Sequence, residues 1–183
     1  MEGYLALLRG INVGGKNLIK MAALKACFEG MGLAGVRTYI QSGNVIFESG
    51  ETERARLTAQ IEAGLLATFG LELPVVVRSA GEMERIVAQA PAGFGSEPDS
   101  YRYDVIFLKE PLTAEEALAV VTAKPGVDEV SGGEGVLYFS RLISKATQSQ
   151  LSRIVGTPIY QRITIRNWKT TTKLAAMIAG DEG

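Results

Sequence analysis

A glycine-rich polar segment, RGINVGGKN (residues 9–17), directly follows the apolar run YLALL near the start of the chain. Glycine-rich backbone can present amide N–H groups to an anion, and a lysine and a helix start nearby add positive charge. The segment lacks the spacing of a phosphate-binding P-loop or of a dinucleotide-binding glycine fingerprint, so neither of those sites is predicted. Two interpretations stay open: an anion cradle, or a turn in which Gly14 and Gly15 only permit the backbone conformation.

A second polar segment, QSGN (residues 41–44), separates two short runs with the composition of strands. Its small polar pair, Ser42 and Gly43, is a signal for a hairpin turn. In the fold that we predict below, this hairpin and the glycine-rich segment lie at the same end of one sheet. Together the two segments are rich in hydrogen-bond donors and contain no acidic residue. The candidate ligand-binding residues are Arg9, Asn12, Gly14, Gly15, Lys16, Asn17, Gln41, Ser42 and Asn44.

A third segment, RNWKTTTK, lies near the end of the chain and contains the single tryptophan, Trp168. Arg166 follows the last predicted strand, and Asn167 has the side chain of a helix N-cap before a threonine-rich first turn that includes Thr170. These four residues could form a second anion site with an aromatic lid. In the alternative interpretation, Trp168 fills the junction between the two halves of the chain and Arg166 pairs with a surface carboxylate.

Histidine is absent, and Cys27 is the single cysteine. Catalysis by Ser-His-Asp or Cys-His groups and metal sites with histidine ligands are therefore excluded, and we expect neither a metal nor a cofactor. Leu24, Cys27, Phe28 and Met31 recur at the spacing of an amphipathic helix, which predicts a packed core thiol rather than a nucleophile. One cysteine cannot form an internal disulfide, which agrees with a reducing compartment.

The charges are nearly balanced, with 19 Lys and Arg against 20 Asp and Glu, for a net charge of -1. No long-range field would attract a polyanion or an anionic membrane, so nucleic acid is an unlikely partner. The first residues lack the features of a signal peptide, and no run approaches the roughly 18 apolar residues that span a bilayer. We therefore expect a cytoplasmic protein with no membrane partner, and its oligomeric state stays open.

The hydrophobic periodicity of the first half predicts the order β-α-β-β-α-β. Its strands are expected at residues 3–8, 36–41, 44–48 and 72–79, and its helices at 20–31 and 51–69. A short extra helix follows, opened by a capping box of Ser79 and Glu82. The stretch PAGFGSEPDS (residues 91–100) is rich in Gly, Pro and Ser and is expected to be a linker.

The second half predicts the same order again, followed by a last helix over residues 169–179. Its strands are expected at 101–108, 127–130, 135–140 and 163–165, with the turn SGGE inside the hairpin, and its helices after the capping box of Thr113 and Glu116 and at 145–155. The predicted fold class is α+β, with two tandem ferredoxin-like units that have antiparallel sheets, plus a C-terminal helix. The expected domains are 1–90, the linker 91–100, and 101–183.

Three stretches, LLRGINVGGKN, TYIQSGNVIF and RNWKTTTKL, together resemble the bacterial domain-of-unknown-function family 1697 over nearly the whole chain. The resemblance implies a small bacterial cytosolic protein and contributes no catalytic residues, because the family has no assigned activity. Family members often have proline at the position of Lys20. They often read RNWNT where this chain reads RNWKT, so that Lys169 stands in place of an asparagine. Those departures weaken any role assigned to the two lysines.

The expected function is a binding module for a small anionic metabolite or nucleotide. A histidine-free, metal-free enzyme that acts on such a ligand is one alternative, and a protein-interaction module is another. The carboxylates do not favour catalysis, because Glu82 and Glu116 are explained by capping boxes. The sequence therefore leaves the catalytic residues, if any, unknown.

Overall fold

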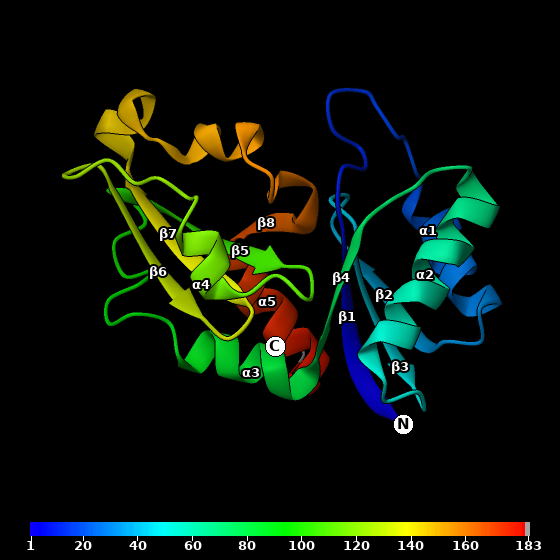
Figure 1. Cartoon of the computed structure of the whole chain (residues 1–183). Coiled ribbons are helices and arrows are strands. Elements are labelled where there is room, and N and C mark those ends of the chain that lie inside the picture. The colour runs from blue at the N-terminus through cyan, green and yellow to red at the C-terminus, as the bar shows by residue number, and fades with distance from the viewer. Residues whose placement is uncertain (182–183) are drawn as a thin grey trace. The chain divides into compact units, whose positions relative to one another are not determined.

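Two four-stranded antiparallel sheets, one in each half of the chain, form the framework of the computed structural model, which describes residues 1–181 (Figure 1). The contacts group the chain into a first unit, Met1–Met83 with the residues from Leu174 on, and a second unit, Glu84–Lys173. This grouping divides two helices between the units, so the expected domain limits at residues 90 and 101 stay predictions. The predicted fold class of two ferredoxin-like units is confirmed.

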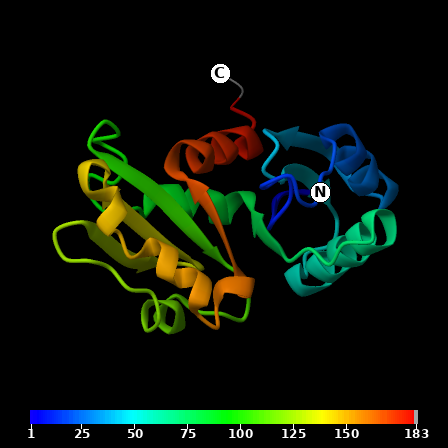
Figure 2. The same cartoon turned by 90° about the horizontal axis from the view of Figure 1, so that it is seen from above.

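The sheet of the first unit has the strand order β2-β3-β1-β4, with all neighbours antiparallel. Helices α1 and α2 lie side by side on one of its faces (Figure 2). The elements are β1 (Glu2–Leu8), α1 (Met21–Gly30), β2 (Ala34–Tyr39), β3 (Asn44–Ser49), α2 (Arg54–Phe69) and β4 (Val75–Ser79).

The core of the first unit follows from the two periodicities of its elements. Alternate residues of β1 and β3 turn one face of the sheet toward the helices, where Phe28 of α1 packs on Phe47 of β3 with ring centroids 5.6 Å apart. Cys27 is buried in the same core, and its Sγ lies 3.3 Å from the hydroxyl oxygen of Thr68 on α2. The predicted burial of this thiol is confirmed.

The sheet of the second unit has the equivalent order, β6-β7-β5-β8. Its core gathers Ile106, Leu137 and Phe139 from the strands against Ala117 and Leu151 from the helical segments. Its elements are β5 (Tyr101–Leu108), α4 (Ala114–Leu118), β6 (Asp128–Gly133), β7 (Val136–Leu142) and β8 (Ile163–Asn167), and the two helices divided between the units are α3 (Ala80–Ala88) and α5 (Trp168–Ala179).

Two local predictions in the second unit are wrong. Instead of one helix over 145–155, the chain forms short 3₁₀ helices, η1 (Ile143–Gln148), η2 (Leu151–Gly156) and η3 (Tyr160–Arg162). Lys145 departs from helical geometry, and the hydroxyl of Ser149 accepts from the N–H of Leu151, so a side chain competes with the helical hydrogen bonds. The hairpin is also tighter than predicted, because β6 continues to Gly133 and leaves only Glu134 and Gly135 between the strands.

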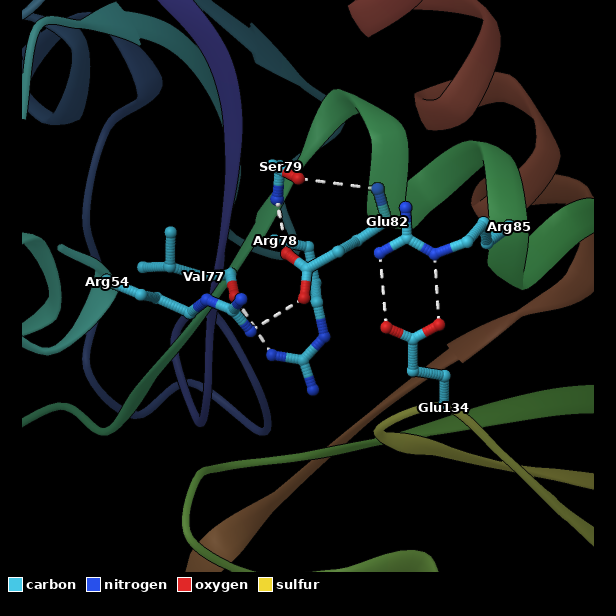
Figure 3. Close-up of polar contacts among 7 residues, drawn as sticks. All are labelled: Arg54, Val77, Arg78, Ser79, Glu82, Arg85 and Glu134. Atoms are coloured by element: carbon cyan, nitrogen blue, oxygen red, sulfur yellow. Dashed lines mark hydrogen bonds and ion pairs between the residues drawn. The ribbon is translucent and has the colours of Figure 1, made fainter. Parts of the chain in front are cut away.

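The two predicted capping boxes are present. At α3, the N–H of Ser79 donates to Glu82 Oε2 (2.8 Å) and the N–H of Glu82 donates to Ser79 Oγ (3.3 Å; Figure 3). Arg54 of α2 adds an ion pair, with Nη1 2.7 Å from Glu82 Oε1, and thereby ties the start of α3 to the first unit. At α4, Thr113 and Glu116 form the same reciprocal pair, and the hydrogen bonds from Thr113 lower the pKa of Glu116.

The last turns of α5 pack against the first sheet on the face opposite α1 and α2. Arg37 Nη2 donates to the backbone oxygen of Met177 (2.8 Å), and Ile178 lies against Gly3 of β1. The predicted C-terminal helix is thus present, with Trp168 as its first residue. Across residues 1–181, no helix combines the length and the apolar character that crossing a bilayer would need.

Candidate ligand-binding sites

The glycine-rich loop and the hairpin turn lie next to each other in the first unit, as predicted. Asn12 Nδ2 donates to the backbone oxygen of Gln41 (2.9 Å), and the N–H of Leu8 donates to the backbone oxygen of Gly43 (2.8 Å). The topology explains this contact, because β1 pairs antiparallel with β3 and the turn before β3 therefore meets the end of β1.

The asparagine amides of this loop pair are used inside the protein. Asn12 Nδ2 also donates to the oxygen of Ile19 (3.0 Å), while its Oδ1 accepts from the N–H of Ile19 (2.8 Å). Asn44 is fully buried and donates to Tyr39 O and Ser42 Oγ, each at 2.9 Å. Both amide hydrogens of Asn12 and of Asn44 are thus committed to holding the two loops in shape.

The glycines of the loop serve its backbone conformation. Gly14 (φ 58°) and Gly15 (φ 73°) are left-handed, as is Asn17 (φ 50°), whose Nδ2 donates to Gly10 O at 2.9 Å. The tip is exposed and partly apolar, because Val13 stands beside these residues with 65% of its surface accessible. The loop is therefore a well-ordered turn, and its remaining exposed cation is Lys16, while Arg9 is half-buried.

The four residues of the predicted second site divide into two pairs. Arg166 and Thr170 are buried, and Arg166 Nη1 donates to Thr164 Oγ1 (2.8 Å) and to Ile165 O (2.9 Å). Burial lowers the pKa of the Arg166 guanidinium to about 10, which leaves it charged at neutral pH. Asn167 and Trp168 instead line an open cavity, and Asn167 is the N-cap of α5, its Oδ1 accepting from the N–H of Thr170 (2.7 Å).

This cavity lies wholly within the second unit and has a volume of about 550 Å³. We call it the Trp168 cavity. Its lining is mostly aromatic and charged: Gly95, Pro98, Tyr101, Arg102, Tyr103, Asp104, Arg141, Ile165, Asn167, Trp168 and Lys169.

Strand register gathers the polar residues of the Trp168 cavity. Arg102 and Asp104 lie two positions apart on β5 and therefore share a face of the sheet. Arg141 of β7 stands directly opposite Arg102, and Asn167 of β8 stands directly opposite Asp104. Three strands and the start of α5 thus contribute to one small area.

The electrostatics of this area favour a bound anion. Three cations, Arg102, Arg141 and Lys169, line the cavity with a single carboxylate, Asp104. Burial raises the pKa of Asp104, and the positive charges of Arg141 and Arg102 offset only part of that effect. Arg141 Nε is buried and has no acceptor among the described residues, which is a costly state for a charged donor.

The sequence alone did not identify Arg102, Asp104 and Arg141 as site residues. The available signal was the alternation of tyrosines with Arg102 and Asp104 in the run YRYDVIFL, where charged residues interrupt a strand that is otherwise apolar. Which face of the strand is charged and what stands opposite it depend on pairing with β7 and β8. Among the described residues, no cluster of three or more His, Cys, Asp or Glu side chains is suited to hold a metal ion.

Comparison with known proteins identifies the family. The chain belongs to the family described as protein of unknown function DUF1697, whose model matches residues 1–138. Its structure is similar to that of a conserved bacterial protein, SP0830, from Streptococcus pneumoniae, with a TM-score of 0.84 and 29% sequence identity over 97% of this chain and 98% of the other. Among curated proteins, none matches.

Proposed function

We propose that this protein binds a small anionic metabolite or nucleotide and that the Trp168 cavity is the binding site. The observation that carries the proposal is the gathering of three cationic side chains and an indole in one cavity, where the buried Nε of Arg141 has no acceptor among the described residues. A phosphate or carboxylate oxygen would supply that acceptor.

The chemistry of the lining suits a ligand with an anionic group and a planar ring. Arginine recognises phosphate and carboxylate through paired N–H donors. Arg102 and Arg141 stand opposite each other on the adjacent strands β5 and β7. Trp168 and Tyr101 offer aromatic surface on which a base or another ring could stack. The volume of about 550 Å³ falls in the range of small-molecule sites.

The glycine-rich loop is the weaker location for the same function. Both amide hydrogens of Asn12 are committed to protein carbonyl groups, and the exposed cation of the loop is Lys16. An exposed lysine is strongly hydrated and gives a small net gain on binding an anion in water. The loop therefore supplies fewer converging charges than the Trp168 cavity.

A second candidate function is an enzyme that acts on the bound anion. Asp104 favours it, because a half-buried carboxyl group with a raised pKa beside two arginines can act as a general acid or base. In that case Asp104→Asn would abolish turnover of a ligand that it still binds. For either function we place the protein in the bacterial cytoplasm, where the unpaired Cys27 would stay reduced.

A thermal-shift screen with phosphorylated metabolites and nucleotides tests the proposal, followed by calorimetric titration of each compound that raises the melting temperature. Arg102→Gln and Arg141→Gln should each weaken binding about tenfold or more, because each removes a charge-assisted contact. The matched control is Arg153→Gln, an exposed arginine of the same unit outside the cavity.

Lys16→Ala distinguishes the two locations. We expect it to leave the affinity of the identified compound unchanged. A loss of affinity in Lys16→Ala, with no loss in the two arginine variants, would move the site to the glycine-rich loop. A screen in which no anionic compound stabilises the protein would contradict the proposed function itself.

A further inference from the structure

A second cavity of the second unit has an aromatic and acidic lining. Its volume is about 370 Å³, and we call it the aromatic cavity. Four aromatic rings and two carboxylates dominate it: Phe94, Glu97, Tyr101, Tyr103, Glu129 and Tyr138. No lysine or arginine is among its lining residues, in contrast to the Trp168 cavity.

Strand pairing brings one carboxylate to the rings. Glu129 of β6 stands opposite Ser140 of β7, and Ser140 stands opposite Tyr103 of β5, so the three side chains form a row on one face of the sheet. Tyr138, two residues from Ser140, shares that face. The other carboxylate, Glu97, comes from the segment 91–100.

The rings are held in place by contacts with the protein. Phe94 meets Tyr103 edge-on at a centroid distance of 4.9 Å and meets Tyr138 in the same way at 5.5 Å. The hydroxyl of Tyr138 donates to the backbone oxygen of Ile86 at 2.6 Å, and that of Tyr103 accepts from the N–H of Glu97 at 3.2 Å. The aromatic wall is therefore preorganised, which lowers the entropic cost of binding.

We propose that the aromatic cavity binds a small quaternary ammonium compound. The faces of aromatic rings attract cations, and quaternary ammonium groups are recognised by such rings because they carry no N–H donor that needs an acceptor. Glu97 and Glu129 add two negative charges, so the same cavity disfavours an anion. One cation, Arg166, shares this face of the sheet. It lies on β8, which β5 separates from β7 and β6, and it does not line the cavity.

Choline and its neutral carbon isostere, 3,3-dimethyl-1-butanol, are the probes for this site, because they have nearly the same shape and differ in charge. Binding of each to the full chain is measured by calorimetry and by shifts in its NMR spectrum. We expect choline to bind about tenfold more tightly than the alcohol, as cation–π attraction predicts.

Charge-removing variants locate the binding. Glu129→Gln and Glu97→Gln should each weaken choline binding about two- to fivefold, as expected for partly screened charges. Glu115→Gln removes an exposed carboxylate of the same unit outside the cavity and should have no effect. Phe94→Leu removes a ring and keeps an apolar side chain, so it should abolish choline binding, with circular dichroism confirming that the variant is folded.

Three results would overturn the proposal. They are equal affinity for choline and the alcohol, absence of choline binding, and choline binding that neither glutamate variant alters. All three results can be obtained without Phe94→Leu, so they stand even if that variant proves unstable. Failure here is distinguishable from failure of the anion site, because the latter is tested with different ligands and different residues.

Discussion

The indole ring of Trp168 occupies the space that a side chain at position 95 would require. Gly95 has a left-handed backbone (φ 86°), and the ring of Phe94 meets the same indole edge-on at a centroid distance of 5.1 Å. The segment 91–100 is therefore packed against the first turn of α5 and builds walls of both cavities. The absence of a side chain at position 95 therefore leaves room for the indole.

Gly95→Ala should displace Trp168. Left-handed geometry costs a non-glycine residue about 1–2 kcal/mol, and overlap with the indole adds about 1–3 kcal/mol for a crowded site. We therefore expect a lower free energy of unfolding in urea and a shift in the fluorescence of the single tryptophan. The shift reports movement of the ring directly.

Gly93→Ala is the matched control for the packing part of this effect. Gly93 is also left-handed (φ 79°), but a Cβ there would meet only the hydroxyl of Ser96 at an ordinary distance of 3.7 Å. That variant should show the backbone cost alone, with the tryptophan fluorescence of the wild type. Identical fluorescence changes in the two variants would show that Gly95 does not position the indole.

The order of elements was predictable because its signals are local. Helix periodicity, the two capping boxes and the turn residues at Ser42 and Gly43 each act within a few residues. The prediction failed over 145–155, where apolar spacing suggested a helix. There the hydroxyl of Ser149 competes with the backbone, and the N–H of Gln150 donates to Asp128 Oδ2 of β6 at 2.8 Å. The second contact is tertiary and leaves no mark in the local sequence.

The candidate site was less predictable than the fold. Asn167 and Trp168 were identified from the sequence because helix starts and single tryptophans are recognisable in isolation. Arg141 was not, because its place opposite Arg102 depends on the register between β5 and β7. In the loop pair, the contact between Asn12 and Gln41 was implied by topology. The commitment of both Asn12 amide hydrogens to carbonyl groups was not, because it depends on the detailed backbone conformation of the two loops.

Asn12 should matter for stability far more than Lys16 does. Asn12→Asp keeps the acceptor for the N–H of Ile19 but removes both donors, so the oxygens of Ile19 and Gln41 lose a partner and face a negative charge. We expect a loss of about 1–3 kcal/mol in the free energy of unfolding. Lys16→Ala should change it by no more than about 0.5 kcal/mol. Equal effects of the two substitutions would contradict a structural role for Asn12.

Cys27 should react slowly with a thiol reagent in the native protein. Its side chain is buried among core residues of α1 and α2, with Sγ 3.6 Å from the backbone oxygen of Gly64. Modification by dithionitrobenzoate therefore requires local or global opening. We expect slow labelling in buffer and complete labelling of one thiol in denaturant. Fast labelling of folded protein would mean that the packing of this helix pair is wrong.

Asp104 should make stability depend on pH in a defined direction. Burial raises its pKa in the folded protein above the value of about 3.9 in an unfolded chain. The folded state therefore holds this proton more tightly. The contribution of Asp104 to stability is fully present below the unfolded pKa and is lost as the pH rises through the folded pKa.

Asp104→Asn keeps the shape of the protonated carboxyl group and cannot ionise. Its melting temperature should match that of the wild type near pH 3.5 and exceed it increasingly toward neutral pH, because only the wild type bears the cost of a partly desolvated charge there. Asp99→Asn, at an exposed position in the same unit, reports the effect of removing one negative charge without burial. Melting curves by circular dichroism across this range measure both differences. If the advantage of Asp104→Asn shrinks as the pH rises, the two neighbouring arginines outweigh burial, and Asp104 is held as a carboxylate rather than as a proton donor.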